Sequence, residues 1–174
     1  MKVKMDDNEK CIRKEFFPDL DDELCEKDVS NVFGFISLFD HVLTEREAGE
    51  CQVMSYSMAL ENGHLDTYLA GERKFVSLYT AMARAGVLYN HRDGVLRLDS
   101  QDPGLIDVFV RSLREQEFMD VYFLASSVRL VGGYDRADMV VMKKGPGWQE
   151  LALLVADAGL ALWERRFAGV AQVH

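Results

Sequence analysis

The fold class is decided by the stretch Val87-Leu88-Tyr89-Asn90-His91-Arg92-Asp93-Gly94-Val95-Leu96-Arg97-Leu98. Two short apolar runs, 87–89 and 95–98, flank a polar segment that contains Asp-Gly, and this pattern predicts two β-strands joined by a turn. The residues before this stretch have helical periodicity instead. Helices followed by strands are typical of an α+β fold.

Upstream of this hairpin, the sequence predicts three helices. The first is expected to begin near Asp28 or Ser30, either of which can cap it. Its apolar residues share one face at helical spacing: Val32, Phe35, Ile36, Phe39, Val42 and Leu43. A second helix is expected between Thr44 and Asn62, and a third over 72–84. The third has its own apolar face: Phe75, Leu78, Tyr79 and Met82.

Downstream of the hairpin, strands are mixed with two further helices. Asp102 followed by Pro103 predicts a helix start, because aspartate caps helices and proline fits the first helical position. The apolar residues of this helix are Ile106, Phe109, Val110 and Leu113. The other expected elements are strands at 121–124, 128–131 and 139–142, a helix over 148–158 and a closing strand at 160–163.

A chain of 174 residues is most simply one domain, and it is long enough to bury a core. We therefore expect a single α+β domain over 1–174, with an N-terminal helical segment packed on a C-terminal mixed or antiparallel sheet. Residues 28–86 are expected to be mainly helical, and 87–174 to form strands with two helices. Residues 1–27 are expected to be an acidic segment, in which 19–26 forms either a short helix or an exposed loop.

The net negative charge lies entirely in the first seventy residues. Residues 1–70 hold 16 Asp and Glu against 7 Lys and Arg, and residues 71–174 hold 13 of each, which recovers the total of −9. Such a field attracts basic partners and repels nucleic acid. Because the acidic half is also the predicted helical half, we expect the charge on the helical layer. The candidate partner-binding acids are Asp19, Asp21, Asp22, Glu23, Glu26, Asp28, Asp40, Glu45, Glu47 and Glu50.

The spacing of the residues matches no catalytic or metal-binding motif. Gly132-Gly133 before Asp138 faintly resembles the nucleotidyltransferase pattern, but the second metal-binding carboxylate is missing. Three widely spaced cysteines and four separated histidines give no ligand set: Cys11, Cys25, Cys51, His41, His64, His91 and His174. We expect no catalytic residue, no cofactor and no metal. The odd cysteine count and the absence of an apolar signal core favour the cytoplasm, without membrane contact.

One local segment, Gly132-Gly133-Tyr134-Asp135-Arg136-Ala137-Asp138, joins two of the expected strands. This segment, together with the small, acidic and motif-free character of the chain, resembles bacterial immunity proteins, including those paired with contact-dependent growth inhibition toxins. The resemblance implies a non-catalytic monomer that neutralises a basic protein, most simply a nuclease-type toxin, and that binds no nucleic acid. Nuclease sites are basic because they hold phosphates, so clustered carboxylates can occupy them. Tyr134, Asp135 and Arg136 are further candidate partner-binding residues.

Two other functions stay open. An acidic secretion chaperone is similarly small and α+β, but it dimerises and exposes an apolar stripe to hold its client. An enzyme with a scattered site is the third possibility, because catalytic triads are not contiguous in sequence. A monomer in solution favours the immunity function, and a tight homodimer favours the chaperone.

Overall fold

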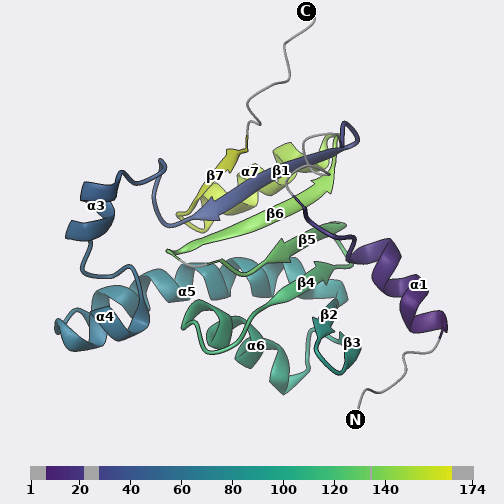
Figure 1. The fold of residues 1–174 in the computed structure, drawn as a ribbon, viewed down its shortest axis with the longest axis horizontal. Helices are drawn as coiled ribbons and strands as arrows, with labels where there is room; N and C mark the ends of the chain where they lie inside the picture. Colours follow the sequence, from purple (N-terminus) through teal and green to yellow (C-terminus); the bar gives the residue numbers. More distant parts are fainter. Residues whose placement is uncertain (1–6, 22–27, 134, 166–174) are drawn as a thin grey trace, which may run out of the picture.

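The computed structural model describes residues 7–21, 28–133 and 135–165 of the chain. Within them, a seven-stranded antiparallel sheet has the order β3-β2-β4-β5-β6-β1-β7 (Figure 1). Its strands are β1 (Asn31–Ser37), β2 (Val87–His91), β3 (Gly94–Leu98), β4 (Asp120–Phe123), β5 (Val128–Val131), β6 (Ala137–Lys143) and β7 (Ala161–Glu164). The helices are α1 (Asp7–Phe16), α3 (Glu45–Glu50), α4 (Tyr56–Glu61), α5 (Leu65–Met82), α6 (Pro103–Leu113) and α7 (Gly147–Asp157), with a 3-10 turn, η1 (Ala83–Ala85). The α+β class is confirmed.

The hydrophobic core lies between one face of the sheet and helices α5, α6 and α7. Helix α5 buries the residues that its periodicity predicts: Phe75, Leu78, Tyr79 and Met82. On β6, Val140 and Met142 belong to the same core, because alternate residues of a strand point to one side of a sheet. None of the helices in the described ranges is both long and apolar enough to cross a membrane.

The strands and helices after α5 lie close to their predicted positions. Strands β2 and β3 form the expected hairpin. Asp102 caps α6, and its carboxylate accepts a hydrogen bond from the backbone nitrogen of Gly104. The buried face of α6 contains Phe109, whereas Ile106 is 50% exposed. Turn and cap residues are local signals, which explains why this half is predictable.

The first predicted helix is wrong, because residues Asn31–Ser37 form β1. This strand lies inside the sheet between β6 and β7, and apolar residues occupy both of its faces. A short apolar run of this kind cannot be distinguished from a buried helix by periodicity. Gly34 was a contrary signal, since a Cβ there would lie 2.5 Å from the Trp148 ring. Val42, expected on a buried face, is 68% exposed.

The second predicted helix is two short helices, α3 and α4, with a loop between them. The predicted ends are confirmed. The Thr44 side chain caps α3, and Gly63, with a φ of 72°, follows α4. The third helix, α5, begins at Leu65 rather than at residue 72. Residues 28–86 therefore contribute a strand and three helices, not three helices alone.

The N-terminal segment packs on the sheet face that the core helices leave open. Phe16 makes an edge contact with Tyr122 of β4, with ring centroids 4.8 Å apart. Arg129 of β5 forms a bidentate ion pair with Asp120, in which Nε and Nη2 of the arginine lie 2.8 and 2.9 Å from the two carboxylate oxygens. The Arg129 guanidinium also lies over the ring of Phe17. Residues 7–21 are thus attached to the sheet.

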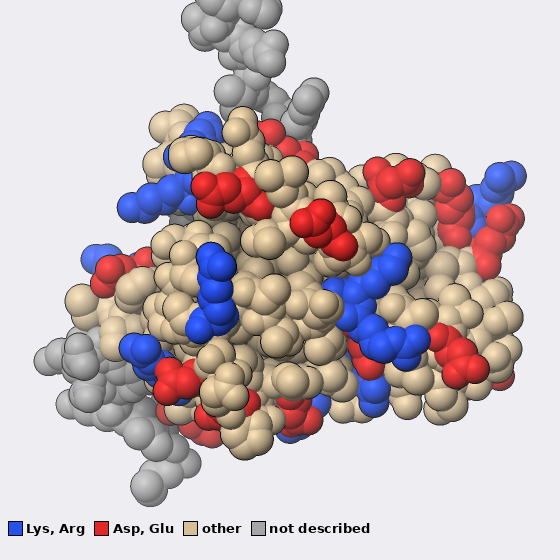
Figure 2. All heavy atoms as spheres, turned by 180° about the vertical axis from the view of Figure 1, so that it is seen from behind, with Lys and Arg blue, Asp and Glu red and all other residues tan. Residues whose placement is uncertain are grey.

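The expectation that the acidic charge lies on the helical layer is wrong. Figure 2 shows the molecule from behind, where α5, α6 and α7 cover the sheet, and acidic and basic side chains are interspersed there. The cause is that most of the core-covering helices come from the neutral half of the chain. Most of the described acids of the first half lie instead on α1, on the loops that flank β1, and on α3, while Glu61 lies on α4 and Asp66 on α5.

Candidate functional site

A hollow of about 400 Å³ opens at the end of β1, where the chain leaves the sheet toward α3. We call it the α3 groove. Its walls come from β1 and β7, the loop before α3, α3 itself, the loop after it, and the turn between β5 and β6. Most of the lining is apolar: Phe35, Phe39, Val42, Leu43, Met54 and Trp163.

The aromatic part of this lining is held by neighbouring strands. Phe35 of β1 and Trp163 of β7 are paired in register, and their ring centroids are 5.0 Å apart. The indole nitrogen of Trp163 is shielded from solvent and has no hydrogen-bond partner within the described part of the chain. Beside these rings, Val42 exposes 68% of its surface. The groove therefore presents an apolar surface larger than one isolated side chain.

Carboxylates border the groove. The His41 ring lies 2.7 Å from the carboxylate of Asp40 and 3.2 Å from that of Glu47. The hydrogen bond to Asp40 raises the pKa of His41, and the same bond lowers the pKa of Asp40. Hydrogen bonds from Thr44 lower the pKa of Glu47. These two acids therefore stay ionised well below neutral pH, and the exposed Asp135 lies at the opposite wall.

Helix α3 is placed by its own N-terminal cap. The backbone and hydroxyl of Thr44 both donate to the Glu47 carboxylate, at 2.8 Å each, and the Glu47 nitrogen donates back to the hydroxyl. Ala48 of α3 lines the groove. Glu45 is one turn before Ala48 on the same side of the helix, whereas Glu50 is two residues away and faces another direction. Glu45 thus joins the rim, and Glu50 does not.

The turn between β5 and β6 contains three of the predicted partner-binding residues. Asp135 and Arg136 both have positive φ, 61° and 58°, which gives a tight turn that favours small polar residues such as aspartate. Asp135 is exposed, while Arg136 is 5% exposed and lies beneath α5, 4.0 Å from the centre of the Tyr68 ring. The Arg136 side chain is therefore a buried anchor for the turn, not a surface group. Tyr134 lies outside the described residues.

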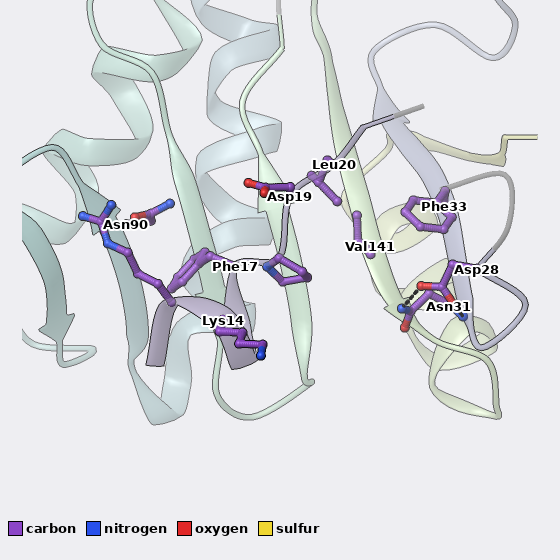
Figure 3. A pocket seen from close by; sticks show the side chains of 11 residues that line it. Lys14, Phe17, Asp19, Leu20, Asp28, Asn31, Phe33, Asn90 and Val141 are labelled. Atoms are coloured by element: carbon purple, nitrogen blue, oxygen red, sulfur yellow. Dashed lines mark hydrogen bonds between the residues drawn. The ribbon is translucent and has the colours of Figure 1, made fainter. Parts of the chain in front are cut away.

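A second hollow, of about 580 Å³, lies on the open face of the sheet between α1 and β1 (Figure 3). It contains two of the predicted acids, Asp19 and Asp28, and also the cation of Lys14. The Asp28 carboxylate accepts hydrogen bonds from Ser30 and Asn31, and the one from the Ser30 hydroxyl lowers its pKa most. This hollow carries both signs of charge.

The two groups of predicted acids lie at opposite ends of β1 (Figure 1). A strand of this length spans roughly 20 Å, which is more than twice the Debye length of about 8 Å at physiological salt. The exposed Asp21 follows Asp19 in the N-terminal group. Asp22, Glu23 and Glu26 lie outside the described residues. The predicted acidic face is therefore two separate groups, and the one at α3 adjoins the apolar groove.

The chemistry of the groove is apolar contact combined with negative charge. Both hydrogen bonds of the His41 ring go to carboxylates. Ser37 also lines the groove, but its buried hydroxyl accepts a hydrogen bond from the Phe39 backbone nitrogen. Throughout ranges 7–21, 28–133 and 135–165, no three His, Cys, Asp or Glu side chains are placed to hold a metal ion. Cys11 is exposed and Cys51 half-buried, both as free thiols.

Sequence reasoning found the carboxylates of the rim but not the groove itself. Met54 and Trp163 are more than a hundred residues apart, and no local pattern connects them. The sequence predicts one buried helix face that contains Phe35, Phe39 and Leu43, although each of them is only half-buried. A strand reading of 31–37 would have placed Phe35 on the face opposite Ile36, where it contacts Trp163.

Comparison of the chain with protein-family models, with curated proteins and with solved structures finds no match. The function proposed below therefore rests on the geometry of the α3 groove.

Proposed function

We propose that the protein is a non-catalytic acidic binding protein that neutralises a basic protein partner, as an immunity protein blocks a nuclease-type toxin. The observation that carries the proposal is the α3 groove, an apolar hollow bordered by the carboxylates of Asp40, Glu45, Glu47 and Asp135. An apolar centre within a polar or charged rim is the general anatomy of a protein interface.

The charge of the rim suits a surface that binds phosphates. Such a surface carries lysine and arginine, and a negative rim attracts it during the diffusional encounter. The lowered pKa values of Asp40 and Glu47 keep this attraction present across physiological pH. A protein seated on these residues would cover the basic site and exclude its nucleic-acid substrate.

The distribution of charge over the molecule supports one binding end. The helical face carries interspersed charges (Figure 2), and the hollow near α1 contains Lys14 together with its acids. The α3 end combines carboxylates with exposed apolar surface, and desolvated apolar contacts supply most of the binding energy at interfaces. Carboxylates and an apolar groove therefore lie side by side at this end.

Affinity capture followed by an activity assay tests the proposal. The immobilised protein is incubated with a lysate of its native host, and a captured protein is identified by mass spectrometry, purified and assayed for nucleic-acid cleavage. We expect a basic protein whose cleavage activity is lost when one equivalent of this chain is added. The variant Asp40→Lys/Glu45→Lys should fail to inhibit, whereas the control Asp19→Lys/Asp21→Lys should inhibit normally.

Three results would contradict the proposal. A captured protein whose activity is unaffected by this chain would remove the neutralising role. A tight homodimer that holds an unfolded client segment would support the secretion chaperone. Turnover of a substrate by the purified chain would support an enzyme.

A further inference from the structure

We infer that the α3 groove receives one large apolar side chain of the partner, from a segment in which lysine or arginine flanks that side chain. The inference rests on the proposed function, because it names the part of a basic partner that this site recognises. It is carried by two features of the groove, its apolar lining and its acidic rim.

The groove has room for a large apolar side chain together with part of the segment that carries it. Its volume of about 400 Å³ lies in the range of pockets that hold a whole small-molecule ligand, which is larger than one side chain. Three aromatic rings line it, those of Phe35, Phe39 and Trp163. Aromatic walls favour an aromatic or branched aliphatic occupant, and buried anchors of this kind dominate the binding energy of interfaces.

The rim selects basic neighbours for that anchor. Asp40, Glu45, Glu47 and Asp135 surround the apolar lining, and Arg46, which points to solvent, is the single Lys or Arg between residues 40 and 50. Lysine and arginine extend apolar stems along such a surface while their charged ends reach carboxylates. An acidic segment would be repelled by the same rim. Charge complementarity therefore assigns the groove to a basic apolar segment.

The indole nitrogen of Trp163 is a donor without an acceptor among the described residues. That nitrogen is shielded from solvent, but the ring to which it belongs lines the groove, so its N–H signal in an NMR spectrum should change when the groove is occupied. The chain has two tryptophans, and Trp148 packs against the core from α7, so their two indole signals report on different places.

An NMR titration of the ¹⁵N-labelled full-length protein tests the inference. The probe is a capped nine-residue peptide of four lysines, four glycines and a central leucine. One matched peptide has serine in place of leucine, and another has glutamate in place of every lysine. We expect a saturable shift of the Trp163 indole signal, assigned with Trp163→Phe, and a steady Trp148 signal. The serine peptide should bind at least about tenfold more weakly, and the glutamate peptide should not bind.

Two variants of α3 separate the groove from its rim. Ala48→Gln fills the groove without changing charge, because Ala48 lines it. Gly49→Gln is the matched control, because a Cβ at Gly49 meets no atom within 4 Å. We expect Ala48→Gln to weaken peptide binding at least about tenfold and Gly49→Gln to leave it within about twofold.

Each contrary outcome overturns the inference in a distinct way. Equal binding by the two α3 variants, or equal binding of the leucine and serine peptides, would show that the groove holds no anchor. If Asp40→Lys/Glu45→Lys then still abolishes partner inhibition, the proposed function stands without the groove. Phe167 is the first aromatic residue after β7 in the sequence. Peptide binding that appears only in the variant Phe167→Ser would assign the groove to the chain's own C-terminal segment. A Trp163 shift that depends on protein concentration alone would assign it to a second copy.

Discussion

Asp138 of β6 is a buried carboxyl group whose ionisation affects the free energy of unfolding near neutral pH. Its carboxylate lies in the core under α5, where it accepts hydrogen bonds from the Tyr79 hydroxyl and the Gly133 nitrogen. Burial raises the pKa of Asp138 to about 6, against the partial compensation of those bonds and of Arg136. The folded protein therefore holds this proton at pH values where the unfolded chain has lost it.

Asp138→Asn should remove this pH dependence. The stabilising effect of protonation is fully present below pH 4 and is lost as the pH rises through 6, because the folded-state pKa is the higher one. The free energy of unfolding of the wild type, relative to the variant, should fall by about 2 kcal/mol from pH 4 to pH 7. Urea denaturation of both proteins across this range is the measurement. A constant difference would show that Asp138 stays ionised throughout.

Ile36 and Phe35 are neighbours on β1 with opposite surroundings. Ile36 is fully buried against the core helices, while Phe35 is half-buried on the other face beside Trp163. Ile36→Ala should cost about 2–5 kcal/mol, and Phe35→Ala about 2 kcal/mol, half of the value for a fully buried phenylalanine. A helix over 28–43 would allow Phe35→Ala to cost more stability than Ile36→Ala. Chemical denaturation of the two variants shows which substitution lowers the free energy of unfolding more.

At the scale of elements, α3 is held by its cap and by no buried side chain. A helix of six residues is not stable by itself, so its N-terminal hydrogen bonds decide whether it forms. Thr44→Ala should weaken the cap by about 1 kcal/mol and increase hydrogen exchange at 45–50, with little change in the Tm. Ser55→Ala, at the cap of α4, is the control and should leave α3 unchanged. Unaltered exchange at 45–50 in Thr44→Ala would contradict this role of the cap.

His41 should make partner binding pH-dependent. Its pKa is raised by the hydrogen bond to Asp40, so at low pH the ring is protonated more readily than a free imidazole and cancels one negative charge of the rim. The Kd for a basic partner should therefore increase about two- to fivefold as the pH is lowered until the ring is protonated. His41→Asn, which cannot be protonated, should show a flatter profile in calorimetric titrations. A steeper profile in that variant would exclude His41 as the cause.

Local signals within single elements explain which parts of the structure can be predicted from the sequence. Helix α5, the β2–β3 hairpin and the cap at Asp102 have local signals, namely periodicity, a turn and a capping side chain. Strand β1 has apolar residues on both faces, so only its length and Gly34 distinguished it from a helix. The α3 groove needs β1, β7 and α3 to meet in space, which no local pattern encodes.

At the scale of the whole molecule, the acidic half of the sequence does not form one acidic surface. The described acids among the predicted partner-binding residues divide between the two ends of β1, roughly 20 Å apart, and salt screens each group from the other. In the proposed complex the α3 end alone attracts and holds the partner. Equal changes of charge at the two ends should therefore have different effects on association.

The most direct test of a single binding site at the α3 end is to measure association with the purified partner. Stopped-flow kinetics are recorded at low and at high salt. Two double variants, Asp40→Lys/Glu45→Lys and Asp19→Lys/Asp21→Lys, change the net charge by the same amount. Neither replaces Glu47, whose side chain takes part in the cap of α3, or Asp135, which has a positive φ. The first variant should slow association about tenfold at low salt and flatten its salt dependence, with the second within about twofold of the wild type. Equal slowing by the two variants, or slowing by the second alone, would contradict a binding site at the α3 end.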